Sequence, residues 1–230
     1  MKMIIRLLTM VALICGFAVI FKTSSGVAAE EPYPMLSWQA ESFVPFAYSG
    51  RALPTVHTPV WVYLDVIQNG KQANLSSKDI RWYVDGIIFK RGKGLTSIEL
   101  PKTNLLNKAN YKVRVEVAEY STNFNLSKTL ILPLVKPQVE IEAPFYGSDV
   151  SPSSFRLIAW PYYFQAGGMG DLNFVWSENG IRKFTASPNE YNVVVDPTSP
   201  VGSQLKINLT AAGANNFESA SRDINFYIRP

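Results

Sequence analysis

The sequence predicts an all-β protein, with two similar β-sandwich modules in tandem behind an N-terminal leader. Three observations support this: a motif that occurs twice, strand-length segments of alternating apolar and polar residues, and turn residues between them. In the motif, Trp82 stands four residues before Gly86, and 94 residues later Trp176 stands four before Gly180. The Asp-Gly and Asn-Gly pairs at these places are typical of tight hairpin turns. Each copy therefore predicts a strand that ends in a turn.

Alternating strands follow the turn in both copies. Residues 111–119 and 204–212 are the first of them, and residues 126–134 and 221–230 close the copies. Val113, Val115 and Val117 are expected to point inward, as in an antiparallel sheet with one face in water. Further strands are predicted at residues 60–67, 97–101, 139–142, 155–164 and 190–197. Pro161 lacks an amide donor, so it indicates a sheet edge or a bulge.

Composition supports two globular domains, at residues 30–137 and 138–230. The chain has 230 residues, of which 47% are hydrophobic and 13% aromatic, enough for two ordinary cores and too apolar for general disorder. The single cysteine is Cys15, which lies in the leader. The remaining chain therefore forms no disulfide and no cysteine metal site.

Residues 1–29 are predicted to be a signal peptide. Lys2 and Arg6 precede an apolar run at residues 7–21, and Val27 and Ala29 fit the positions before a cleavage site. The expected location is extracellular, cell-surface or periplasmic. An uncleaved anchor is the alternative, although the run is shorter than the roughly 20 residues of a membrane span. Membrane contact is expected only through this leader.

Charge argues against nucleic-acid binding. The formal net charge is +4, but without the leader the chain has 19 basic and 18 acidic residues. Residues 30–137 carry 13 basic and 9 acidic residues, whereas residues 138–230 carry 6 and 9. This difference predicts weak head-to-tail self-association, in which the aromatic segment 36–54 supplies an apolar centre.

No catalytic, cofactor or metal motif is present. The single histidine, His57, lies in a predicted loop and reads as a surface residue. The sequence contains no nucleophile elbow, P-loop, zinc-protease or EF-hand pattern. A glycosidase-type carboxylate pair stays open, because such acids need no proximity in sequence. A calcium site at Glu140, Glu142 and Asp149 is a further alternative.

Two aromatic clusters are the candidate partner-binding residues. The first is Trp38, Phe43, Phe46 and Tyr48, and the second is Trp160, Tyr162 and Tyr163, which precede a glycine-rich loop at residues 165–171. Aromatic rings beside a loop suit sugar stacking or protein contact. The alternative is that they are core residues under ordinary loops. The basic cluster Lys90, Arg91 and Lys93 reads as a solvated hairpin tip or as an anchor for an anionic polymer.

The tryptophan, its turn and the Tyr-x-Val start of the later strand resemble immunoglobulin-like (Ig-like) and PKD-like bacterial domains. In this resemblance Tyr111 is the corner tyrosine and Val113 replaces a cysteine, while Ser203 takes the tyrosine's place in the second copy. Residues 36–54 also resemble a segment of secreted Ig-like proteins from bacteria with reduced genomes, some of them linked to pilus assembly. The resemblance covers nearly all of the mature chain and implies a fold rather than an activity.

The sequence therefore predicts a non-enzymatic, secreted cell-surface protein with a structural or adhesive role. Its expected partner is a protein or a second copy of itself. Alternatives are a carbohydrate-binding protein, which would bind a surface polysaccharide, and a component of a pilus or surface layer. No cofactor is expected. The partner itself is not encoded in any motif.

Overall fold

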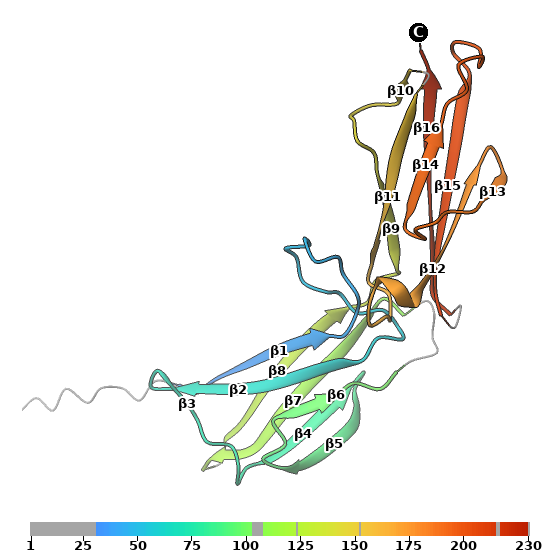
Figure 1. Ribbon diagram of the computed structural model, residues 1–230. Helices are drawn as coiled ribbons and strands as arrows, with labels where there is room; N and C mark the ends of the chain where they lie inside the picture. Colours follow the sequence, from blue (N-terminus) through green and yellow to red (C-terminus); the bar gives the residue numbers. More distant parts are fainter. Residues whose placement is uncertain (1–30, 103–107, 123, 152, 215–216, 230) are drawn as a thin grey trace, which may run out of the picture.

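The computed structural model describes residues 31–102, 108–122, 124–151, 153–214 and 217–229. The predicted signal peptide therefore lies outside the described residues. Almost all regular structure is β-strand, and a short 3₁₀ turn, Met169–Asp171, is the one helical element within the described part. Figure 1 shows two β modules joined end to end in a bent, elongated molecule. The start of the first strand and the C-terminus lie at opposite ends.

The first module is a sandwich of two antiparallel sheets. One sheet has the order β1-β2-β3, with β6 also paired to β2. The other has the order β5-β4-β7-β8. The strands are β1 (Tyr33–Ala40), β2 (Val60–Gln68), β3 (Lys71–Gln72), β4 (Asp79–Val84), β5 (Ile87–Lys93), β6 (Ser97–Glu99), β7 (Asn110–Ser121) and β8 (Phe124–Pro133).

Alternating side chains from β2 and β7 form the core of this module. Val113, Val115 and Val117 of β7 are buried, as the sequence predicts. They belong to one hydrophobic cluster with every second residue of β2. The residues of β7 that lie between the valines are exposed or half-buried. A strand with period two thus places its apolar residues on one face, which is what makes the two sheets pack.

The second module repeats this architecture. Its sheets have the orders β14-β11-β9 and β10-β16-β15-β12-β13, and β10 runs parallel to β16. The strands are β9 (Gln138–Glu142), β10 (Asp149–Val150), β11 (Ser154–Tyr162), β12 (Leu172–Glu178), β13 (Ile181–Lys183), β14 (Glu190–Val194), β15 (Gln204–Gly213) and β16 (Ser219–Ile228). A separate cluster of buried residues, from Val139 to Ile228, forms its core.

The two tryptophans of the repeated motif occupy equivalent places, which confirms the repeat. Trp82 on β4 is 0% exposed and Trp176 on β12 is 1% exposed. Each indole Nε1 donates to a backbone carbonyl beyond the following strand: that of Leu95 at 2.8 Å and that of Pro188 at 3.0 Å. A buried indole N–H needs such an acceptor, and in both modules a backbone carbonyl provides it.

The hairpin turns after the tryptophans are also equivalent. Asp85 and Asn179 both have positive φ, 52° and 50°, and a glycine with positive φ follows each. This is the geometry of a type I′ turn, which favours Asx-Gly. The Asp85 side chain accepts the backbone amide of Lys112 at 3.1 Å, and Asn179 accepts that of Lys206 at 2.9 Å.

These contacts correct one assignment from the resemblance. Since Lys112 and Lys206 are equivalent, the counterpart of Tyr111 is Leu205 and not Ser203. Leu205 is buried and has no hydroxyl, so the second module lacks a tyrosine corner. In the first module the corner is present, because the Tyr111 hydroxyl donates to the Pro101 carbonyl at 2.6 Å. Counting from the turn glycine gives the same register, because Tyr111 and Leu205 each lie 25 residues after it, at Gly86 and Gly180.

Pro161 lies where β11 is locally an edge. The pairing of β11 with β14 ends at Ile158, whereas its pairing with β9 continues past Pro161, which lies opposite Val139. The missing amide of Pro161 therefore removes no ladder bond toward β14. Two residues later the backbone of Tyr163 has a φ of 64°. This change of direction ends the strand at the boundary between the modules.

Candidate functional site

The two aromatic clusters, far apart in sequence, meet at the joint between the modules. The loop between β1 and β2, residues 41–59 (the β1–β2 loop), leaves the first module and reaches the end of β11 (Figure 1). There the Phe43 amide donates to the Phe164 carbonyl, and the Tyr163 amide donates to the Phe43 carbonyl, both at 2.7 Å. The loop thus adds a short antiparallel bridge to the second module.

Tyr48 extends this contact with its side chain. Its hydroxyl lies 2.7 Å from the hydroxyl of Tyr163. Its ring meets the rings of Tyr162 and Tyr163 edge-on, with centroids 5.5 and 6.2 Å apart. Gly50 makes room for the Tyr48 ring, since a Cβ at position 50 would lie 2.4 Å from Cζ of Tyr48. The ring therefore depends on a residue without a side chain beneath it.

Tyr162 and Tyr163 have raised pKa values, so both stay protonated over the ordinary pH range. Burial, the hydrogen bond to Tyr48 and the neighbouring hydroxyls raise the pKa of Tyr163 to about 12. Burial, together with the charge of Glu140, also raises the pKa of Tyr162. A tyrosinate here would lose hydration without gaining a cation. The joint is therefore built from neutral phenols.

The structure separates the predicted partner-binding residues into two groups. Tyr163 is buried, Phe43 packs against the second core, and Trp38 packs against the first. The Arg51 guanidinium lies over the Trp38 ring, 4.7 Å from its centroid. Phe46, in contrast, is 107% exposed. Of the aromatic residues of segment 36–54, Trp38 and Phe43 thus pack against the two cores, as one reading of the sequence predicts, whereas Phe46 is free for an external contact.

The remaining members, Tyr48, Trp160 and Tyr162, wall a pocket of about 430 Å³, here named the aromatic–acidic pocket. Trp160 and Tyr162 alternate with the buried Pro161, so both lie on the outer face of β11. Glu140 on β9 lies directly opposite Trp160. All lining residues are Pro45, Ala47, Tyr48, Ser49, Glu140, Ile141, Glu142, Trp160 and Tyr162.

The two carboxylates of this pocket have different partners. Glu142 accepts a hydrogen bond from the Trp160 indole Nε1 at 2.5 Å. Glu140 forms an ion pair with Arg222, with Oε2 3.3 Å from Nε. Among the described residues Glu142 has no cationic partner. The pocket is therefore lined by aromatic rings and carries one carboxylate that no cation neutralises.

A second contact at the joint involves residues that the sequence does not single out. The buried Glu218 accepts a hydrogen bond from Thr55 Oγ1 and, through Oε2, from the amide of Gln165 at 2.6 Å. Thr55 is held in turn by Thr58, with hydroxyls 2.8 Å apart. A glutamate in the loop just before β16 carries no local signal for such a role. Its partner lies 163 positions earlier in the chain.

His57 lies at the same joint and not on the free surface that the sequence predicts. It is half-buried, and its ring lies 6.0 Å from that of Phe217. Its Nε2 is buried and has no hydrogen-bond partner within the described residues. A cavity of about 590 Å³ adjoins it, and Lys108 and Lys136 also line that cavity. Thr55, Glu218 and Ser219 line the same cavity, but within the described residues none of them is hydrogen-bonded to His57 Nε2.

The other candidates are dispersed. The described residues contain no group of three metal-ligating side chains. Asp149 forms an ion pair with Arg229 at the far end of the second module, so it does not join Glu140 and Glu142. In the glycine-rich loop the amides of Gly167 and Gly168 donate to Asp171, which folds the loop onto itself.

The basic cluster lies along an edge strand and not at a hairpin tip. Lys90, Arg91 and Lys93 belong to β5, the outer strand of its sheet. The described part of the chain contains no ion pair to any of the three. A register shift between Trp82 and Tyr83 marks a bulge opposite them. Bulges and lysines are typical protection of a sheet edge against further pairing.

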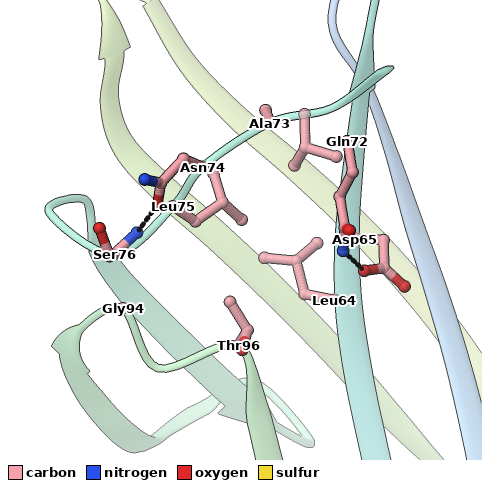
Figure 2. Close-up of a pocket in the computed structure, with 10 residues that line it drawn as sticks. Leu64, Asp65, Gln72, Ala73, Asn74, Leu75, Ser76, Gly94 and Thr96 are labelled. Atoms are coloured by element: carbon pink, nitrogen blue, oxygen red, sulfur yellow. Dashed lines mark hydrogen bonds between the residues drawn. The ribbon is translucent and has the colours of Figure 1, made fainter. Parts of the chain in front are cut away.

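A separate polar depression lies on the side of the first module (Figure 2), between β2, the loop that follows β3 and the turn at Gly94. Its polar groups bond to one another. Gln72 donates to Asp65 at 2.6 Å, and Asn74 accepts the amide of Ser76 at 3.0 Å. These bonds shape the loop and leave no convergent donors or acceptors for a ligand.

No protein-family model matches the sequence, and no curated protein is similar to it. Among solved structures, three N-terminal domains of the Hoc capsid protein of bacteriophage RB49 share 10% identity over 86% of this chain, with a TM-score of 0.47. This chain spans 59% of that structure's length. Fibronectin(III)-like modules of Clostridium thermocellum CbhA share 10% identity, over 85% of this chain and 94% of theirs, at a TM-score of 0.29. Sidekick-1 immunoglobulin domains share 10% identity, over 86% of this chain and 69% of theirs, at a TM-score of 0.28.

These likenesses say nothing of a partner or an activity. The fold itself rests on the strand order and on the two buried cores. Within the described residues no helix has the length or the apolar character needed to span a bilayer.

Proposed function

We propose that the protein is a non-enzymatic, exported interaction protein. Residues 30–137 and 138–230 would be two Ig-like domains that act together as one structural or adhesive arm, and residues 1–29 would direct export. The joint is the observation that carries this proposal. Four separate contacts hold it: the Phe43–Phe164 bridge, the Tyr48–Tyr163 hydroxyls, the Tyr48–Tyr162 rings and the Thr55–Glu218 bond.

A joint of this kind fixes the distance and the orientation of the second domain relative to the first. Flexible linkers leave two domains free to reorient, whereas here a loop of the first domain is paired to the second. The start of β1 and the C-terminus lie at opposite ends (Figure 1). Attached by its N-terminal side, such a protein presents its second domain away from the attachment point. That is the geometry of a spacer or of an adhesive arm.

The supporting evidence against catalysis is chemical. In the described part of the chain, the carboxylates of the aromatic–acidic pocket are engaged by Trp160 and Arg222. The Nε2 of the half-buried His57 is hydrogen-bonded to no hydroxyl or carboxylate among the described residues. Interaction is therefore the role that the arrangement of side chains favours, with a protein or a second copy of the chain as partner.

Fractionation and cross-linking in the native cell test this role. We expect the protein in an exported fraction, cross-linked to a surface protein or to further copies of itself. Copies linked in series would favour a pilus or surface-layer component. A cytoplasmic protein without neighbours would contradict the proposal. A variant with the basic residues Lys2 and Arg6 changed to glutamate is the control for export.

A second candidate function is carbohydrate binding, favoured by one observation. Trp160 and Tyr162 lie on the outer face of β11 next to Glu140 and Glu142. Aromatic faces and carboxylates together are a common means of holding a sugar. Binding of the purified protein to surface polysaccharide, lost in Trp160→Ala, would support this function.

A further inference from the structure

The geometry points to a cation site: we propose that the aromatic–acidic pocket binds an alkylammonium group, either of a small molecule such as choline or of a lysine side chain. This inference deepens the interaction role proposed above by naming a ligand chemistry. Three features of the pocket carry it: the angles between its rings, the charge of its carboxylates and its place between the two modules.

The rings of the pocket form walls and not a flat strip. The planes of Tyr48 and Tyr162 are inclined by 72°, and their centroids are 5.5 Å apart. A sugar ring stacks on one open aromatic face, whereas a compact cation is enclosed by several faces at angles. Trp160, whose ring attracts cations best among the aromatic side chains, lines the same pocket. The arrangement therefore resembles an aromatic cage more than a stacking platform.

The charges of the pocket favour a cation. Glu140 and Glu142 line it, and none of its lining residues is a lysine or an arginine. Arg222 neutralises Glu140 from outside, which leaves Glu142 as the unpaired charge. The bond from Trp160 Nε1 fixes the Glu142 carboxylate beside the indole. A cation in the pocket would meet an aromatic face and a carboxylate together.

The size and origin of the walls also matter. A volume of about 430 Å³ lies within the range of roughly 300–1,000 Å³ found for small-ligand sites. Tyr48 comes from the β1–β2 loop, whereas Trp160 and Tyr162 come from the second module. The cage is complete only when the joint is closed, so a bound cation would also stabilise the joint.

Binding is best followed by NMR on the mature protein. The indole N–H signal of Trp160, assigned with Trp160→Phe, is the reporter. The probes are choline, its uncharged isostere 3,3-dimethylbutan-1-ol, N-acetyl-lysine methylamide and glucose. We expect choline or the lysine derivative to shift this signal and the two neutral compounds to leave it unchanged. The tighter of the two cations identifies the source of the ammonium group.

Matched variants test the role of charge. In Glu142→Gln the side-chain carbonyl still accepts the indole N–H, so the pocket keeps its shape while the charge is lost. We expect cation affinity to fall about tenfold, the effect of losing one close ion pair at a partly exposed site. Asp149→Asn removes a carboxylate from the far end of the same module and should leave affinity unchanged.

Three outcomes would overturn the inference. Equal shifts with choline and its uncharged isostere would show an apolar pocket without cation preference. A response to glucose alone would show a sugar site. Absence of any shift would also refute it. The location of the protein and its cross-linked neighbours are measured separately. Failure of the cation-binding test therefore does not decide whether the proposed interaction role is right.

Discussion

Tyr48 and Tyr163 share a hydrogen bond of 2.7 Å across the joint, although they are 115 residues apart in the chain. Tyr48 is placed by a loop of the first module, and Tyr163 by a backbone with positive φ at the end of β11. The hydrogen bond forms only when both tyrosines are held in these positions. The pair shows that the two modules are joined by built contacts as well as by the linker.

The first prediction concerns this joint. Gly50→Ala places a methyl group where the Tyr48 ring lies, so the ring must move and its contacts with Tyr162 and Tyr163 are lost. We expect small-angle X-ray scattering to show a broader range of inter-module distances. Gly168→Ala is the control, because nothing lies within 4 Å of a Cβ there. Identical scattering of both variants would mean that Tyr48 does not hold the joint.

A smaller change separates the hydroxyl from the ring. Tyr48→Phe removes the bond to Tyr163 but keeps the ring packing. A net hydrogen bond contributes about 1 kcal/mol, so we expect a modest loss of stability of the joint. Limited proteolysis of the β1–β2 loop is the measurement, and cleavage should be slower than in Gly50→Ala. Faster cleavage than in that variant would contradict the order of these contacts.

The third prediction concerns the buried core of the first module. Val115→Asp buries a carboxylate without a partner at a position that is 1% exposed. Such burial costs several kcal/mol, against a total stability of about 5–15 kcal/mol. We expect the first module to unfold, as measured by loss of its thermal transition. Lys112→Asp, on the exposed face of the same strand, should melt nearly as the wild type does.

Two separate unfolding transitions should follow from the two cores. Trp82→Phe and Trp176→Phe each remove an indole and leave a carbonyl without its donor. Each should lower the stability of its own module by about 2–4 kcal/mol. Calorimetry would then show one shifted and one unshifted transition in each variant. A single transition that shifts equally in both would mean that the domains unfold as one unit.

Asp85 predicts a specific acid sensitivity. Burial raises its pKa, but the hydrogen bonds from Lys108 and the Lys112 amide outweigh this, so the net shift is downward. A lowered folded-state pKa means that the carboxylate stabilises the fold above the unfolded value of about 4. That contribution is lost as the pH falls through the folded pKa. Above that window its effect on stability is constant.

Asp85→Asn tests this without breaking the turn, because asparagine already occupies the equivalent position 179. At neutral pH we expect the variant to lose the ion pair with Lys108 and a small part of its stability. Below about pH 4 the free energies of unfolding of variant and wild type should converge. Glu31→Gln, an exposed acid before β1, is the control. A constant difference down to pH 2 would contradict the argument.

The strands were predictable because their signals are local. Alternating valines in β7 and the Asx-Gly turns after Trp82 and Trp176 each need only a few neighbouring residues. The burial of both tryptophans followed from the same pattern. The register of the later strand was also available from the sequence: Leu205, and not Ser203, lies as far from Gly180 as Tyr111 lies from Gly86. The turn contacts of Lys112 and Lys206 agree with that alignment.

The joint was not predictable, for a physical reason. Tyr48 and Trp160 could be proposed as partner-binding residues because each lies in an aromatic cluster of the sequence. That they share one pocket depends on how a loop of one module meets a strand of the other. Glu218 is the clearest case, because its burial and its bond to Thr55 follow from tertiary contact and contradict the usual exposure of glutamate.

The start of β1 and the end of β16 lie at opposite ends of the molecule (Figure 1), and this has a mechanical consequence. A pulling force applied between these two points passes through the joint, where two backbone hydrogen bonds of Phe43 and a few side-chain contacts resist it. Each sandwich, in contrast, is held by continuous ladders of hydrogen bonds between paired strands. The β1–β2 loop would therefore peel from Phe164 first. The molecule would lengthen by straightening its bend, with both cores still folded, and would close again when the load is released.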